Sequence, residues 1–145
     1  MSGHRYEDDY YAWTREQADF LRAGRLANLD KEHLIEELDS MGARDYRELI
    51  SRLAILIQHL IKWEYQPDWR SKSWALTIIE QRAQIAQLFE QSPSLKARLT
   101  DEALRKAYRR ALAAASTETG LEVQRFPSEN PYDLEMLMDS GYWPE

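Results

Sequence analysis

Apolar residues recur along this chain at spacings of three and four, which is the period of one face of an α-helix. Gly24 follows the first such stretch and predicts a helix C-cap there. Asp30 is a good N-cap for a second helix, which Gly42 is expected to kink or break. The residues on the first face are Tyr6, Tyr10, Trp13, Gln17, Phe20 and Leu21, and those on the second are Leu34, Ile35, Leu38 and Met41.

The pattern resumes after Gly42 and stops at Pro67. Its apolar positions span an arc of roughly 160°, so we expect a central helix that touches two or more neighbours. They are Tyr46, Leu49, Ile50, Leu53, Leu56, Ile57, Leu60 and Ile61.

Three further helices are indicated downstream. One runs from about Lys72 to Gln91 and ends at Ser92-Pro93, and one is capped by Thr100 and ended by Gly120. Asn130-Pro131 predicts the start of a short third one, with proline in its first turn. The sequence therefore predicts a single all-α domain over residues 1–145. It would be a bundle of four main helices plus a short C-terminal helix, with residues 120–145 forming a tail docked on the bundle.

The amino-acid composition excludes several classes of functional site. The 145 residues include no cysteine, which excludes disulfides, thiolate catalysis and cysteine-bound zinc. No glycine-rich phosphate loop, nucleophile elbow or secretory signal is visible. The longest apolar-rich stretch, Leu53 to Ile61, is too short to cross a bilayer. We expect a cytoplasmic protein with no cofactor, no metal and no catalytic residue assigned.

The net charge of −6 is unevenly distributed along the chain. Residues 1–43 carry 5 basic and 10 acidic side chains, residues 44–110 carry 13 and 8, and residues 111–145 carry 1 and 7. The acidic ends could fold back on the basic middle, or the middle could face an acidic partner. Nucleic-acid binding is disfavoured by the net acidity.

Some polar residues interrupt the apolar arcs. Arg82 lies within the arc of its helix, where it could contact an anion or a partner, pair with a carboxylate or lay its stem over apolar surface. We expect the side-chain amide of Gln17 to lie inside the bundle with its hydrogen bonds formed. His59, which shares a flank with Arg52 and Trp63, is a candidate acid, base or ligand, although a structural role is favoured.

His33, Glu36 and Glu37 form a second polar group with metal-ligand residue types. All three are predicted to project opposite Leu34, Ile35 and Leu38. Metal sites in bundles need inward ligands, so we interpret this group as a solvated face.

The stretch from Lys62 to Trp74 is the most distinctive part of the chain. It contains Trp63, Trp69 and Trp74, three of the five tryptophans, with Arg70 among them. Aromatics and arginine are typical of binding hot spots. The alternative is a corner sealed by large side chains that pack the end of the bundle.

An ordered series of segments resembles the bacterial and cyanobacterial "domain of unknown function 29" family over nearly the whole chain. The segments include Tyr10 to Gln17, Leu34 to Gly42, Ser51 to Trp63, Arg70 to Trp74, Glu118 to Gly120 and the tail from Phe126 to Tyr132. The resemblance implies a bacterial α-helical bundle and carries over no functional residue.

The favoured hypothesis is a small protein-interaction or regulatory module without catalytic activity, with His59, Trp63, Trp69, Arg70, Trp74 and Arg82 as candidate binding residues. The alternative is a small-ligand binder or enzyme that uses His59 in a pocket with Arg52, Trp63 and Arg82. A homodimer is also plausible, because a wide apolar arc and a tail helix can be buried symmetrically.

Overall fold

A computed structural model describes residues 5–145 and contains helices but no strand within that range. The predicted all-α class, with four long helices and a short C-terminal one, is confirmed. The chain divides after Arg44 into two compact units, which are described separately. The single domain over residues 1–145 stays a prediction.

The first unit contains α1 (Tyr10–Arg22), the 3-10 turn η1 (Leu26–Asn28) and the start of α2 (Lys31–Tyr65). Asp9 caps α1 by accepting a hydrogen bond from the Ala12 amide at 3.0 Å. Gly24 follows the helix with φ +70°, a left-handed conformation that glycine adopts without a Cβ penalty. Both ends of α1 therefore have local causes in the sequence.

Gln17 fills the role that the helical pattern predicts for it. Its Oε1 accepts a hydrogen bond of 2.8 Å from the Asp30 amide, directly before α2. The Nε1 of the buried Trp13 donates to Asp30 Oδ2 at 3.0 Å. These two side chains of α1 therefore fix the beginning of α2, and the buried amide is satisfied.

The start of α2 reverses the polarity that its pattern predicts. Ile35, Leu38 and Met41 are exposed to 59%, 66% and 50%, although the periodicity places them on an inward face. His33, predicted on a solvated face, is half-buried instead, because the ring of Tyr6 stacks on it with centroids 4.5 Å apart. The prediction was wrong for His33, which the segment before α1 covers, whereas Glu36 is exposed as predicted.

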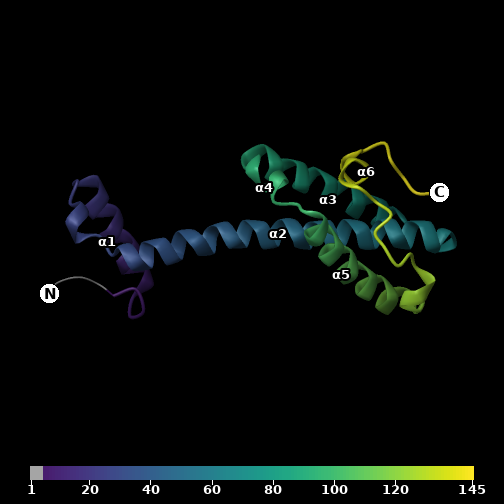
Figure 1. Ribbon diagram of the computed structural model, residues 1–145, viewed down its shortest axis with the longest axis horizontal. Helices are drawn as coiled ribbons and strands as arrows, with labels where there is room; N and C mark the ends of the chain where they lie inside the picture. The colour runs from purple at the N-terminus through teal and green to yellow at the C-terminus, as the bar shows by residue number, and fades with distance from the viewer. Residues whose placement is uncertain (1–4) are drawn as a thin grey trace. The chain divides into compact units, whose positions relative to one another are not determined.

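Helix α2 continues through Gly42 without a break, and the φ of this glycine is not positive. The second unit contains the later part of α2 and the elements after it (Figure 1). These are η2 (Pro67–Trp69), α3 (Lys72–Gln91), α4 (Ser94–Ala97), α5 (Asp101–Thr119), η3 (Val123–Arg125) and α6 (Leu134–Met138).

The core of the second unit surrounds the broad apolar face of α2. Leu49, Leu53, Leu56, Ile57, Leu60 and Ile61 are fully buried there. They pack with Ile78 and Ile85 of α3, with the tail residues Phe126, Tyr132 and Leu137, and with α5, whose buried positions include four alanines. The small alanine side chains of α5 take up little room against the apolar face of α2.

The tail departs from prediction at one point. Asn130-Pro131 does not start a helix, because Asn130 Oδ1 accepts a hydrogen bond from the Tyr132 amide at 2.9 Å and forms a turn. Helix α6 begins at Leu134, capped by Asp133, and contacts α3. No helix within residues 5–145 combines the length and apolarity that crossing a membrane requires.

Candidate binding site at the tryptophan corner

The tryptophan corner, residues 62–74, joins α2 to α3. Pro67 opens the turn η2, and Ser71 caps α3 by accepting a hydrogen bond from the Trp74 amide at 3.1 Å. The chain reverses within six residues between the two helices. Large side chains at this reversal therefore project on both sides of the turn.

One side of the corner forms a cavity of about 380 Å³. Its lining includes the side chains of Trp69 and Trp74 from the corner and of Glu118 from α5. Trp69 is 71% exposed, so a large apolar surface stands open at this site. Lys62, Gln66 and Thr119 complete the lining. Such a mixture of apolar walls and a few polar groups is typical of ligand sites.

Lys62 and Glu118 form an ion pair across the floor of the cavity. Lys62 is only 4% exposed, whereas half of the Glu118 side chain is accessible. The ammonium also lies 4.6 Å from the centroid of the Trp74 ring, a cation–π geometry. The hydrogen bond from Lys62 lowers the pKa of Glu118, so this carboxylate is charged at neutral pH. The accessible charge in the cavity is therefore negative.

The other side of the corner holds the tail. Arg70 Nε donates to the Trp63 carbonyl at 2.7 Å, and Arg70 Nη2 donates to the Glu145 carbonyl at 2.9 Å. The ring of Trp63 packs against Trp143 with centroids 4.9 Å apart. Trp63 and Arg70, both predicted as binding residues, thus contact the protein's own tail.

Arg82 belongs to this tail contact as well. It is 5% exposed, and its Nε and Nη2 donate to the carbonyls of Leu137 and Met136 at 2.8 and 3.2 Å. Both oxygens lie in the last turn of α6, where the Met136 carbonyl also accepts from the Asp139 amide at 3.3 Å, so the guanidinium adds to the C-terminal cap of that helix. The Arg82 Cζ lies 5.9 Å from the centroid of the Trp143 ring.

His59 lies on α2, one turn before Trp63, and does not line the cavity. Its Nδ1 donates to the Ile55 carbonyl at 2.8 Å, which fixes the tautomer of the neutral ring. Burial lowers the pKa of His59, so the ring is neutral at pH 7. Arg52 bonds Gln81 Oε1 at 3.2 Å. The structure therefore separates His59 and Arg52 from the tryptophan cavity.

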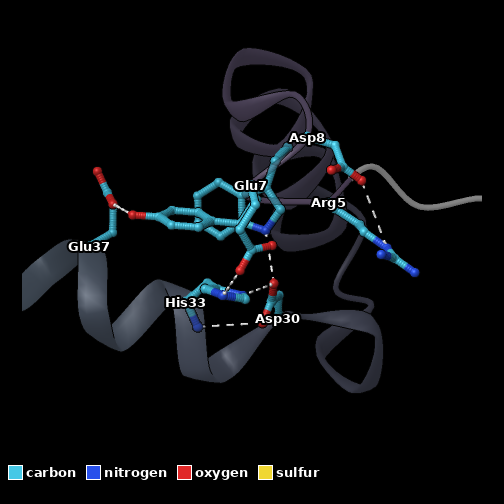
Figure 2. A network of polar contacts seen from close by, with 8 residues as sticks. Arg5, Glu7, Asp8, Asp30, His33 and Glu37 are labelled. Atoms are coloured by element: carbon cyan, nitrogen blue, oxygen red, sulfur yellow. Dashed lines mark hydrogen bonds and ion pairs between the residues drawn. The ribbon is translucent and has the colours of Figure 1, made fainter.

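A separate polar network lies in the first unit (Figure 2). His33 sits between two carboxylates: its Nδ1 is 2.7 Å from Asp30 Oδ2, and its Nε2 is 3.0 Å from Glu7 Oε1. Glu37 accepts hydrogen bonds from the hydroxyls of Tyr6 and Tyr10. Among the residues that the structure describes, no group of three His, Asp or Glu side chains has the arrangement of a metal site. The network joins the segment before α1 to α2.

The sequence profile of a family described as "Domain of unknown function DUF29" matches residues 5–143. The chain belongs to the DUF29 family. No curated protein and no solved structure matches it. The matched range includes both units and all residues that line the cavity.

Four of the six residues that line the cavity were not among the predicted binding residues, and the charged pair Lys62 and Glu118 is the most consequential omission. Lys62 and Glu118 are 56 positions apart, and only the packing of α5 on α2 brings them together. A signal was present for Lys62, which lies one helical turn after Gln58 and next to the buried Ile61. A lysine on the edge of a buried face needs a partner, and Glu118 supplies it.

Proposed function

We propose that this protein is a non-catalytic interaction module of the bacterial cytoplasm, and that the tryptophan cavity receives a basic side chain of a partner protein. The observation that carries the proposal is the exposed Trp69 ring beside the half-accessible carboxylate of Glu118. An aromatic face next to a negative charge favours a lysine or arginine side chain.

The electrostatic setting supports a basic partner. The ammonium of Lys62 is buried and already paired, so an incoming acidic group would gain no accessible cation in the cavity. Residues 111–145, which include Glu118, carry 1 basic and 7 acidic side chains. A cation that approaches this part of the chain is attracted, and an anion is repelled.

The size of the cavity also suits a side chain better than a whole ligand. A volume of about 380 Å³ lies near the lower end of the range for small-molecule sites. The exposed Trp69 adds an apolar rim that a partner surface would cover. An anchor residue in a pocket with an aromatic rim is a common arrangement of interface hot spots.

Affinity capture from a bacterial lysate tests the proposal. We expect wild-type protein to retain a specific partner that Trp69→Ala loses, since removing a hot-spot tryptophan costs about 2 kcal/mol or more. Tyr11→Ala is the matched control, because Tyr11 is an aromatic residue of similar exposure in the other unit. If capture fails, or if Trp69→Ala and Tyr11→Ala retain the same proteins, the proposal is wrong.

A further inference from the structure

The exposed apolar face at the start of α2 is a surface that the proposed function does not use. With about 100° per residue, Leu34, Ile35, Leu38, Met41 and Gly42 fall within about 60° of the direction of Leu38. Three of these side chains are half exposed or more. We call this set the α2 stripe.

Gly42 is an independent sign that something packs closely on the α2 stripe. Its φ is not positive, and a Cβ added there would meet no atom of residues 5–145 within 4 Å. Glycine inside a helix costs about 1 kcal/mol relative to alanine. Neither the backbone conformation nor the described surroundings require that cost, whereas a large side chain of a second molecule packed against this position would.

The charges at the two ends of the stripe identify the occupant. Lys31 precedes the stripe and Asp45 follows it, both exposed and within about 20° of the direction of Leu38 on the same helix. Neither residue is ion-paired within the described part of the chain. Two such helices, placed antiparallel with their Leu38 side chains in contact, bring each lysine against the other helix's aspartate.

The apolar residues are complementary in the same register. Helical geometry places Ile35 of one copy against Gly42 of the second copy, and Leu34 against Met41. A large side chain thus meets a glycine, and a branched side chain meets a flexible one. The surface is self-complementary about a two-fold axis, as a symmetric dimer requires.

We propose that the occupant of the α2 stripe is a second copy of this chain, packed antiparallel through Leu38, with Lys31–Asp45 ion pairs between the copies. The contact is a single helix pair, so it is small and reversible. We expect dimerisation at protein concentrations of about 1 to 100 µM.

Charge reversal with analytical ultracentrifugation of the full chain tests both the surface and its register. Lys31→Glu and Asp45→Lys each place like charges across the interface, so each variant alone is expected to sediment as a monomer at about 100 µM. An equimolar mixture of the two is expected to form a heterodimer, because both positions then pair opposite charges, one pair with its native sign and the other reversed. The double variant in one chain is expected to dimerise as wild type does.

Leu38→Glu is expected to abolish dimerisation without loss of fold, because Leu38 is exposed in the monomer. Leu76→Glu, at an exposed leucine of α3, is the control that leaves dimerisation intact, and helical circular dichroism checks the fold of each variant. A wild-type chain that stays monomeric at about 200 µM would overturn the proposal. So would a dimer that survives Leu38→Glu, or single charge variants that still dimerise and do not complement each other.

Discussion

At the scale of single residues, the buried hydroxyl of Tyr132 is an unpaired polar group. Tyr132 is 1% exposed, and its hydroxyl has no hydrogen-bond partner within residues 5–145. An unsatisfied buried polar group costs about 1 to 3 kcal/mol. We expect Tyr132→Phe to raise the free energy of unfolding by about 1 kcal/mol in urea denaturation. Tyr108→Phe is the contrasting variant and should be destabilising, since the Tyr108 hydroxyl donates to the Pro127 carbonyl at 2.6 Å. Destabilisation by Tyr132→Phe would contradict the assignment of an unpaired hydroxyl.

His33 is the residue through which pH acts on the first unit. The hydrogen bond to Asp30 raises the pKa of His33 above its ordinary value, against the effect of desolvation. A raised pKa means that the stabilisation is complete below the unfolded-state value and is lost as pH rises through the folded-state value. We therefore expect the first unit to lose this stabilisation as pH rises above about 6.5, the ordinary pKa of histidine.

Proton NMR of the His33 ring measures this directly. The midpoint of its titration should lie above that of an unperturbed histidine, and Asp30→Asn should lower it. His59 is the internal reference with the opposite sign, because burial lowers its pKa. Equal midpoints for the two rings would contradict the account.

At the scale of secondary-structure elements, the Lys62–Glu118 pair fastens α5 to α2. Glu118→Ala leaves the buried ammonium without its carboxylate, and we expect a loss of about 2 kcal/mol in the free energy of unfolding, moderated by solvent at the exposed side of Glu118. Lys62→Met should cost less, because it removes the buried charge together with its need for a partner. Urea denaturation gives the free energy of unfolding of each variant. A larger loss for Lys62→Met than for Glu118→Ala would contradict this account of the ion pair.

The Lys62–Glu118 pair is expected to stop stabilising the second unit at acidic pH. The pKa of Glu118 is lowered by the hydrogen bond from Lys62, so its contribution is present above the unfolded-state pKa and is lost as pH falls through the folded-state value. The second unit should therefore lose stability below about pH 4.5, and Glu118→Gln should flatten that dependence. A wild-type profile that the substitution leaves unchanged would count against the pair.

Substitution of Gly42 is expected to change helix stability and self-association in opposite directions. Gly42→Ala is expected to raise the melting temperature of dilute, monomeric protein, because alanine favours the helix by about 1 kcal/mol. The added methyl should at the same time weaken the dimer in which Ile35 of the second copy lies against this position. Circular dichroism at about 1 µM and sedimentation at about 100 µM separate the two effects. A decrease in the melting temperature at low concentration would contradict the expected gain in helix stability. Dimerisation as strong as that of wild type would contradict the expected close contact at Gly42.

Helix boundaries were the part of the fold most accessible from the sequence. The limits of α3 follow from Ser71 before it and Ser92-Pro93 after it, and those of α5 from Thr100 and Gly120. These residues act on their immediate neighbours, so local chemistry suffices to find them. The predicted helix start at Asn130 was wrong because an asparagine side chain can either cap a helix or close a turn. Which of the two forms depends on the conformation of the next few residues.

The candidate site was only partly accessible, because most of it depends on contacts between distant segments. Composition pointed correctly to the tryptophan corner as a set of large side chains at one helix junction. It did not separate Trp69 and Trp74, which line the cavity, from Trp63 and Arg70, which hold the tail. The two groups differ because Trp143, near the C-terminal end of the second unit, packs against Trp63.

At the scale of the whole molecule, the two units carry two different surfaces. The first unit holds the α2 stripe, and the second holds the tryptophan cavity. We expect the two surfaces to work independently, so that Leu38→Glu leaves partner capture unchanged and Trp69→Ala leaves sedimentation unchanged. Loss of both properties in either variant would show that the surfaces are coupled.

The most direct test of the cavity as a cation-recognition site is NMR of the tryptophan indole N–H groups during titration with a blocked Gly-Arg-Gly peptide. We expect the Trp69 and Trp74 resonances to shift with an affinity of about 1 mM, while that of Trp13, buried in the first unit, stays in place. A blocked Gly-Glu-Gly peptide should produce no shift. Absence of any arginine-dependent shift at Trp69, or an equal response to the acidic peptide, would contradict the proposed recognition site.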